Sequence, residues 1–323
     1  MMAKKKLAIM LLASLVLILF IANVVTRAPI MEVEKDTYSF ASAPAQETKK
    51  PELRLSMMVT ATVMAPEAVM FEGGSWFKSR KMGHSAILLC HPDALLMFDT
   101  GLGRDIDQQF KAMPFYLKPL FSYEILKPAT EQLDIESFCP GRKLQIALSH
   151  LHWDHASGIE DFKGAPVWTP AEELSSGRNS GNKAGYLGNQ FDSSDIQWKP
   201  LDFKKQNYEN YKNSLDFFGD GSVIFVPMGG HTKGSAGMFV NFADGRRFFF
   251  TGDTSWSLEG FARPAHKHAL MRKIVDGNVS ETEQELRRVH ALMQLYPDLH
   301  VIPAHDYNAY VPAAIYPDYL VNN

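Results

Sequence analysis

Four side chains that bind metal ions well lie within six residues: His150, His152, Asp154 and His155. They follow Lys143–Leu148, an apolar run typical of a strand. If the backbone stays extended through His152, side chains two positions apart point to one side, which places His150, His152 and Asp154 together. Two neutral imidazoles hold one cation, and the carboxylate and the remaining imidazole hold a second one nearby. The segment therefore predicts a two-metal site of the kind that activates water for hydrolysis.

The composition limits the partners and the metal ligands. With 46% hydrophobic and 21% charged residues among 323, the chain is long and apolar enough to bury a large core. The formal net charge of −3 gives no reason to expect a nucleic-acid partner. Cys90 and Cys139 are too few for a thiolate zinc cluster, so nitrogen and oxygen must hold any metal. A disulfide between them stays open, and two separate buried thiols are the simpler expectation.

The N-terminal residues predict attachment to a membrane. Lys4–Lys6 precede the apolar run Leu7–Val25, whose nineteen residues would span about 28 Å as a helix. Because signal peptides have apolar cores of about 7–15 residues, we expect residues 1–27 to be an uncleaved transmembrane anchor rather than a cleaved signal peptide. Residues 28–51 are predicted to be a flexible linker, followed by one domain at 52–323. A lipid bilayer is thus an expected partner. The domain would be extracytoplasmic (periplasmic in a Gram-negative cell), or secreted if the segment is cleaved.

A second group of candidate ligands consists of His231, Asp253 and His305. Each comes just after the end of a predicted strand; these strands are Ser222–Pro227, Arg246–Thr251 and Leu299–Pro303. Taken singly, each of the three residues is more often an ordinary polar side chain than a ligand. Like the His150–His155 cluster, however, all three lie just beyond the C-terminal end of a predicted strand. This shared position predicts that four loops converge on one site.

Asp99 follows a predicted hairpin of Met82–Cys90 and Ala94–Phe98. Its carboxylate is placed to accept the free ring N–H of a ligating histidine, although an aspartate that simply turns the chain is the alternative. The remaining histidines show no joint pattern and are left out of the predicted site, although two of them, His266 and His268, could reach the mouth of a pocket. The six left out are His84, His91, His266, His268, His290 and His300.

Two long segments are harder to interpret. Prolines argue against one helix in Met113–Lys127, for which core packing is favoured over a pocket wall, a membrane contact or a dimer face. The glycine-rich part of Gly158–Asp220 suggests a mobile loop, either an active-site cover or a surface insertion. Glu131–Phe138 is predicted to be a short helix, and Ser280–Glu283 matches a capping box at the start of a longer one.

Several motifs in this order resemble those of the metallo-β-lactamase superfamily, over roughly Leu53 to Tyr319. They are His150-x-His152-x-Asp154-His155, Gly230-His231-Thr232-x-Gly234-Ser235, Thr251-Gly252-Asp253 and Ala304-His305, with Asp99-Thr100-Gly101 upstream. The resemblance implies an α/β fold, a four-layer αββα sandwich with the site along one edge of its two sheets. It also implies two zinc ions, one held by His150, His152 and His231 and the other by Asp154, His155 and His305, with Asp253 bridging both.

The bridging Asp253 is similar to that of glyoxalase II-like thioesterases, lactonases and phosphodiesterases, and true lactamases generally lack it. The segment His150–Gly158 and the apolar stretches look most similar to the N-acyl homoserine lactonase-like branch. Such lactonases often carry a tyrosine three residues after the bridging aspartate, which polarises the substrate carbonyl. Here that position is Trp256, whose larger indole has an N–H that is able to donate a hydrogen bond.

The cluster and the resemblance together predict a dinuclear zinc hydrolase. A hydroxide shared by the ions would attack the carbonyl carbon of a lactone or ester with an apolar part, such as an N-acyl homoserine lactone. Asp154 is the predicted catalytic residue, which passes a proton to the leaving group. Three alternatives stay open: thioester, phosphodiester or β-lactam cleavage on the same site, iron or manganese instead of zinc, and a non-hydrolytic metal-binding or redox protein. The sequence gives no oligomeric state.

Overall fold

The computed structural model describes Ser14, Met31 and residues 50–322. The predicted anchor at 1–27 and linker at 28–51 therefore lie outside the described residues, apart from Ser14, Met31 and the last two linker positions. No helix within the described part of the chain is both long enough and apolar enough to cross a bilayer.

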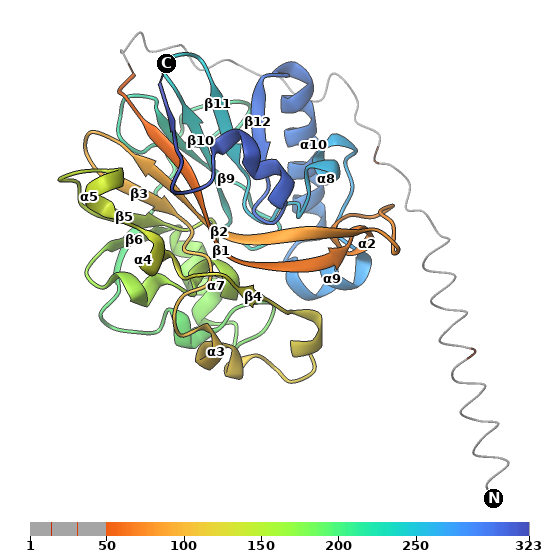
Figure 1. The fold of residues 1–323 in the computed structure, drawn as a ribbon. Helices are drawn as coiled ribbons and strands as arrows, with labels where there is room; N and C mark the ends of the chain where they lie inside the picture. The colour runs from red at the N-terminus through yellow and green to blue at the C-terminus, as the bar shows by residue number, and fades with distance from the viewer. Residues whose placement is uncertain (1–13, 15–30, 32–49, 323) are drawn as a thin grey trace, which may run out of the picture.

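Two β-sheets form the centre of the domain (Figure 1). The larger sheet contains β1 (Arg54–Pro66), β2 (Ser79–Cys90), β3 (Leu95–Phe98), β4 (Glu124–Ile125), β5 (Leu144–Ala147), β6 (Pro166–Thr169), β7 (Gln197–Pro200) and β13 (Leu320–Val321). Its order is β13–β1–β2–β3–β5–β6–β7, with β4 paired to β1. The smaller sheet contains β8 (Leu215–Asp216), β9 (Val223–Pro227), β10 (Ala236–Asn241), β11 (Arg247–Phe250) and β12 (Leu299–Ile302), in the order β12–β11–β10–β9–β8.

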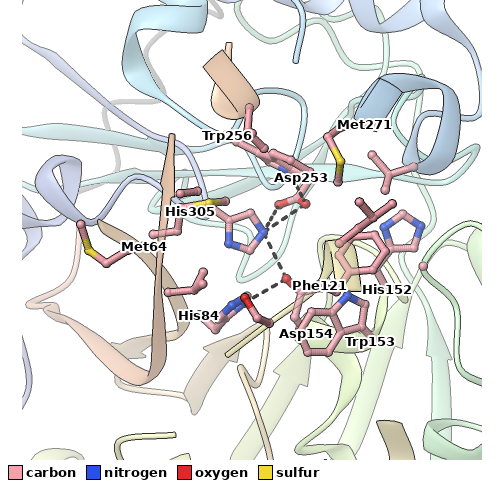
Figure 2. Close-up of a pocket in the computed structure, with 18 of the residues that line it drawn as sticks. Met64, His84, Phe121, His152, Trp153, Asp154, Asp253, Trp256, Met271 and His305 are labelled. Carbon is pink, nitrogen blue, oxygen red and sulfur yellow. Dashed lines mark hydrogen bonds and ion pairs between the residues drawn. The ribbon is translucent and has the colours of Figure 1, made fainter. Parts of the chain in front are cut away.

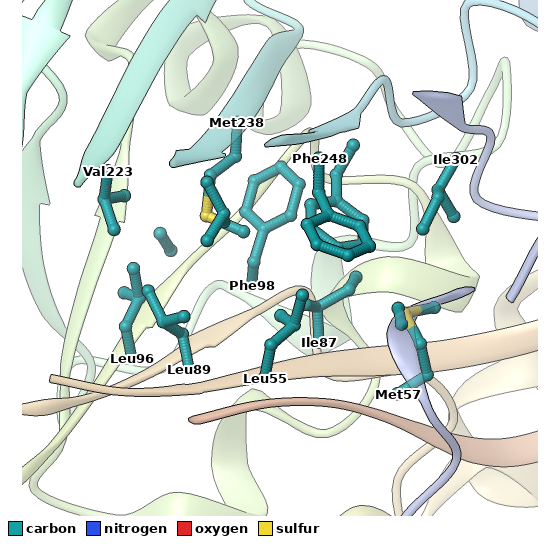
Figure 3. Close-up of a cluster of buried hydrophobic side chains, with 14 of the residues drawn as sticks. Leu55, Met57, Ile87, Leu89, Leu96, Phe98, Val223, Met238, Phe248 and Ile302 are labelled. Carbon is teal, nitrogen blue, oxygen red and sulfur yellow. The ribbon is translucent and has the colours of Figure 1, made fainter. Parts of the chain in front are cut away.

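The main core lies between the two sheets. Alternate residues of a strand point to opposite faces, so Leu55 and Met57 of β1 enter this core while Met58 faces the other side of the sheet. Figure 3 shows Leu55 and Met57 on the side of the larger sheet, and Met238 and Phe248 on the side of the smaller one. Burial of these apolar side chains is the main force that holds the sheets face to face.

Helices cover both outer faces. On the smaller sheet, α10 (Val279–Leu295) buries Leu286 and Val289, and α8 (Leu258–Ala262) buries Phe261, in a cluster with strand side chains such as Phe239. On the larger sheet lie α4 (Ala129–Gln132), α5 (Ile135–Phe138), α6 (Trp153–Ala156) and α7 (Ala171–Arg178). The predicted αββα layering is therefore present. The other helices are α2 (Glu67–Met70), α3 (Ile106–Gln109), α9 (Ala269–Val275), and the 3-10 helices η1 (Phe110–Ala112), η2 (Lys118–Leu120), η3 (Ile159–Phe162), η4 (Gly188–Gln190) and η5 (Tyr307–Ala313).

Two helix starts differ from the sequence prediction. The single helix expected at Glu131–Phe138 is two short helices, because the Asp134 side chain accepts the Ser137 N–H and begins α5 anew. The capping box expected at Ser280–Glu283 is also wrong, since Asn278 caps α10 by accepting two backbone N–H groups. In both places a short polar side chain just before the observed helix satisfies free N–H groups of its first turn.

Cys90 and Cys139 form a disulfide, with Cα atoms 5.3 Å apart. The expectation of two separate thiols is therefore wrong. The bond links the end of β2 to the residue that follows α5, so it fastens an outer helix to the larger sheet. The pairing is a long-range contact of 49 residues, which explains why neither spacing nor local pattern revealed it.

Candidate metal centre

The candidate ligands come from the carboxyl ends of several strands. His150 follows β5, His231 follows β9, Asp253 follows β11 and His305 follows β12. Strands β3 and β5 are parallel, as are β11 and β12, so these strand ends reach the same edge of the molecule. The structure thus brings the two groups of candidate ligands to one place, where all seven predicted side chains are buried.

Three imidazoles meet in the first half of the centre. The Nε2 atom of His231 lies 3.2 Å from His150 Nε2 and 2.9 Å from His152 Nδ1. His231 donates its Nδ1–H to Asp276 at 2.7 Å, and the Nδ1 of His150 lies 2.9 Å from the Ser149 hydroxyl. The Nε2 atoms of His231 and His150 are therefore left with lone pairs that face each other, and these repel unless a cation lies between them.

Protonation does not supply that cation. Burial and the neighbouring imidazoles hold the pKa values of His150 and His152 well below the usual value. Burial and the nearby Lys267 also lower the pKa of His231. Three neutral, buried imidazoles whose nitrogens converge are a donor set that fits a metal ion such as zinc.

The second half combines carboxylates with imidazoles. Asp253 Oδ1 lies 3.2 Å from His155 Nε2 and 3.1 Å from His305 Nε2, while Asp154 Oδ2 lies 3.2 Å from His305 Nε2. His155 Nε2 and Asp253 Oδ1 are buried, and their polar contacts are with other candidate ligands. His305 donates its Nδ1–H to the Gly83 carbonyl at 2.8 Å, so its Nε2 faces the two carboxylates. Buried carboxylate oxygens and imidazole nitrogens that converge on one point fit a second metal ion.

The charges in this half are mutually dependent. Burial alone would lower the pKa of His305, but the carboxylates of Asp253 and Asp154 raise it to about 10. Burial alone would raise the pKa of Asp253, but His305 and His155 hold it well below the usual range. Without a metal ion, an imidazole that carries protons on both ring nitrogens balances the charge of the carboxylates. A metal ion bound among these groups would supply that positive charge instead.

The ligand groupings match the predicted ones only in part. His150, His152 and His231 form one potential metal-binding group, as the resemblance implies. The set implied for the second ion is divided between two other groups: His84 with Asp154 and His305, and His150 with His155 and Asp253. The role of each residue as a ligand stays a prediction.

His84 is a site residue that the sequence analysis left out. Its Nδ1 lies 3.1 Å from Asp154 Oδ2, and its ring lies 5.1 Å from that of His305. Figure 2 shows His84, Asp154, His305 and Asp253 in a continuous row. His84 occupies the middle of β2 rather than a strand end, so the pattern that revealed the other ligands gave no signal for it. Within the described residues, it is the one histidine of the six left out that lines the cavity beside the centre.

Further carboxylates fix the orientation of the imidazoles. Asp99 Oδ2 accepts the Nδ1–H of His155 at 2.8 Å, which confirms the expected contact with a candidate ligand. Asp276, which the sequence analysis missed, accepts from His231 and lies 2.7 Å from the buried Lys267 ammonium. Burial alone would raise the pKa of Asp276, but Lys267 and His231 lower it to about 2.

Trp256 lies against Asp253 in the wall of the cavity. Its indole N–H donates to Asp253 Oδ2 at 2.9 Å. The N–H considered for the substrate carbonyl therefore already has a carboxylate partner, and Trp256 acts as a support for the candidate bridging residue.

Glu173 of α7 is a second residue that the sequence analysis missed, and it connects two ligand loops. Its Oε1 accepts the Leu151 N–H at 2.9 Å, between His150 and His152, and the Tyr186 hydroxyl at 3.0 Å. Its Oε2 accepts the Thr232 hydroxyl at 2.7 Å and the Gly234 N–H at 3.0 Å, just after His231. Four donors thus converge on one fully buried carboxylate. We conclude that this carboxylate sets the distance between the loop of His150 and that of His231.

Replacing Glu173 with glutamine is therefore expected to weaken metal binding by about 10–100-fold, the usual effect of losing a group that supports a metal ligand. Whichever oxygen is replaced, the amide NH2 would face a backbone N–H that needs an acceptor, that of Leu151 at one position or that of Gly234 at the other. Competition with a zinc chelator measures the affinity. The control is Tyr186→Phe, which removes one of the four donors and should change the affinity by much less. Equal affinities for wild type and Glu173→Gln would contradict this role.

Part of the segment Gly158–Asp220 lies against the centre. Gly185 has a φ of +94°, and a Cβ atom there would lie 2.9 Å from the His152 ring. The Tyr186 ring contacts the His152 ring at 4.7 Å. The expectation of one glycine-rich mobile loop is wrong for Gly177, which lies within α7 and packs on Phe191.

A cavity of about 280 Å³ opens beside the candidate ligands (Figure 2). Its apolar lining residues are Val63, Met64, Ala65, Pro66, Val69, Met82, Pro119, Leu120, Phe121, Trp153, Trp256, Met271 and Val275. The segment Met113–Lys127 contributes both to this wall and to the core, where Met113 and Leu117 are buried. The favoured core packing is thus present together with one of its alternatives, the pocket wall.

Comparisons with known proteins agree with this geometry. Residues 80–311 match the model of the metallo-beta-lactamase superfamily. A probable metallo-hydrolase of Mycobacterium tuberculosis is 27% identical over 241 residues, which cover 69% of this chain and 76% of that protein. A probable metallo-hydrolase of Mycobacterium bovis matches with the same identity and coverage.

Solved structures of low identity share the fold. A quorum-quenching N-acyl homoserine lactone lactonase has a TM-score of 0.62 at 15% identity, over 87% of this chain and 100% of that one. An N-acyl homoserine lactone hydrolase with N-hexanoyl-L-homoserine at its catalytic metal centre has a TM-score of 0.63 at 15% identity, over 84% and 100%. A dizinc lactonase has a TM-score of 0.54 at 17% identity, over 88% and 93%.

The family model covers well over half of the chain, and both its span and the clustered histidines and aspartates lie in the same domain. The chain therefore belongs to the metallo-β-lactamase superfamily and is a metal-dependent hydrolase.

Proposed function

We propose that this enzyme hydrolyses lactones or esters with an apolar part, with N-acyl homoserine lactones as the first candidates. The observation that carries the proposal is an apolar cavity that opens directly onto the clustered histidines and aspartates. Two of the solved structures that share the fold are named as N-acyl homoserine lactone hydrolases or lactonases, and one holds a lactone-derived product. Burial of an acyl chain against Met64, Phe121 and Met271 would favour binding of such a substrate.

The proposed metals are two zinc ions, with iron or manganese as alternatives. One ion is assigned to His150, His152 and His231, and the other to Asp154, His155 and His305 with Asp253 shared. Ions bound there lower the pKa of water and polarise a carbonyl group. In this assignment Asp253 is the residue that touches both halves, since its Oδ2 also lies 3.6 Å from His231 Nε2.

Residues of the chain supply the proton transfer and the dry surroundings. Asp154 lies at the floor of the cavity, where it is proposed to hold a proton and to pass it to the leaving alkoxide. His84 donates its Nδ1–H to Asp154 in this proposal and so fixes the direction of the carboxylate. Trp153 and Phe121 form apolar walls that keep bulk water from this proton.

The cavity argues against a phosphodiester substrate. Within the described residues, its lining contains no lysine or arginine that would neutralise a phosphate. Lys267 is buried behind the centre, where it pairs with Asp276.

A panel of four substrates tests the proposal. We expect hydrolysis of long-chain acyl homoserine lactones well above the rates with a glutathione thioester, a phosphodiester and nitrocefin. The control is His152→Ala, which removes a candidate ligand. Lactone rates no higher than those of this control would reject the proposed substrate class, and metal analysis of enzyme purified without added metal would identify the ions.

The proposal also assigns the enzyme to a bilayer surface outside the cytoplasm, through the apolar run Leu7–Val25. The disulfide between Cys90 and Cys139 supports this location, because disulfides persist in oxidising compartments. Fractionation of cells that produce the full chain, with alkaline extraction of their membranes, distinguishes an anchored from a secreted enzyme.

A further inference from the structure

The mouth of the cavity carries an unusual concentration of exposed apolar side chains. We define the mouth surface as Met64, Phe115, Tyr116, Leu120, Ile125 and Leu126. Phe115 is 84% exposed and Met64 is 61% exposed. Exposed apolar residues scattered singly are normal, but these come from two adjacent segments, β1 and residues 113–127.

Several contacts connect the segments of the mouth surface to each other and to the cavity. Met64 and Leu120 both line the cavity. Ile125 belongs to β4, which pairs with β1 at Ala61, three residues before Met64. The rings of Phe115 and Tyr116 contact each other with centroids 5.6 Å apart. Met64 and Leu120 therefore belong both to the mouth surface and to the cavity wall.

The segment that carries most of this surface is firmly held. Met113 and Leu117 are buried in a cluster with Trp153, which lies between His152 and Asp154 in the sequence. The Leu126 N–H donates to the Thr60 carbonyl at 2.9 Å. The exposed side chains thus keep a fixed position relative to the metal centre, and their exposure is not the result of a loose loop.

Basic residues accompany the apolar ones. Lys118 and Lys127 lie in the same segment and Lys111 lies just before it, while the acidic residues there are Glu124 and Asp107, which accepts the Tyr123 hydroxyl at 2.9 Å. A surface that combines exposed aromatic and aliphatic side chains with lysines matches the interface of a membrane that contains anionic lipids. A contact with a second copy of the chain would gain nothing from this excess of positive charge.

The rest of the chain allows this contact. The 24 residues at 28–51 span at most about 85 Å when fully extended, which is enough for any face of the domain to reach a bilayer that holds Leu7–Val25. The length of residues 28–51 therefore does not determine which face of the domain meets the bilayer, whereas the mouth surface does.

We infer that the mouth surface docks on an anionic lipid bilayer and that apolar substrates pass from the lipid directly into the cavity. The docking depends on the six apolar side chains and on Lys111, Lys118 and Lys127. The passage of substrate rests on the proposed lactone hydrolysis, whereas the docking rests on the mouth surface and on the proposed bilayer attachment.

Hydrogen–deuterium exchange of the full chain in lipid nanodiscs tests the docking. In nanodiscs with phosphatidylglycerol, we expect amides at 113–127 to exchange at least about tenfold more slowly than in nanodiscs of phosphatidylcholine alone. The double variant Phe115→Ser/Leu126→Ser should lose this protection. Its matched control is Leu295→Ser, an exposed apolar residue at the end of α10. The control should keep the protection.

Equal exchange in both lipids, or a double variant that exchanges like wild type, would overturn the inference. Protection that appears in detergent and increases with protein concentration would assign the surface to a second copy instead. None of these outcomes depends on turnover, so they are separate from a failure of the lactone proposal. Turnover of a short, water-soluble lactone should be the same in the double variant and in wild type, because neither replaced side chain lines the cavity.

Discussion

In the proposed two-metal centre, replacing Asp253 with serine should remove one of the two ions and lower turnover by more than about 100-fold. Groups that merely support metal ligands contribute about 10–100-fold, so a residue shared by both ions should contribute more. Asp253 is the carboxylate that reaches both halves of the centre, with His155 and His305 on one side and His231 on the other. A serine hydroxyl is shorter and has a single oxygen, so it cannot span both.

The measurement is metal content per chain by mass spectrometry, together with the hydrolysis rate on the best substrate of the panel. Trp256→Phe is the matched control, because it removes the hydrogen bond to Asp253 but leaves the carboxylate in place. We expect this control to keep two ions and to lose less than about tenfold in rate. An Asp253→Ser enzyme with two ions and full activity would show that Asp253 does not bridge them.

The convergence of the candidate ligands could be predicted because it follows from strand topology. His150, His231, Asp253 and His305 come after apolar runs, and strands that run in the same direction deliver their ends to one edge. The spacing of His150 and His152 added the local geometry, since residues two apart on an extended chain share a side. The alternation of side chains along a strand and the order of the strands and ligands along the chain can both be read from a single sequence.

The supporting residues could not be predicted because their contacts depend on distant parts of the chain. Glu173 accepts hydrogen bonds from Leu151 and Thr232, which lie 22 and 59 positions away. His84 meets Asp154 across 70 positions, and it lies inside a strand rather than after one. Such pairs have no local pattern, so only the packed structure reveals them.

The disulfide is also a long-range contact that has no local pattern in the sequence. Its loss should have the largest effect on stability. In the chain-entropy model, a bond that closes a loop of 49 residues restricts the unfolded chain by about 4 kcal/mol at 25 °C. The double variant Cys90→Ala/Cys139→Ala should therefore lower the free energy of unfolding by roughly that amount. Urea unfolding measures the difference, and the single variant Cys139→Ala should lose about as much, because one missing partner already breaks the bond.

The metal centre should survive this change in molecules that remain folded. Cys90 lies six residues beyond His84 along β2, or about 20 Å at 3.3 Å per residue. We therefore expect metal content and turnover per folded molecule to stay within about twofold of wild type, in contrast to Asp253→Ser. Wild type treated with a reductant should unfold at the lower urea concentration of the double variant, whereas the double variant should not respond to the reductant. If reductant left the wild-type midpoint unchanged while the bond was shown to be broken, the disulfide would not restrict the unfolded chain as argued, and the layers would be held by apolar packing alone.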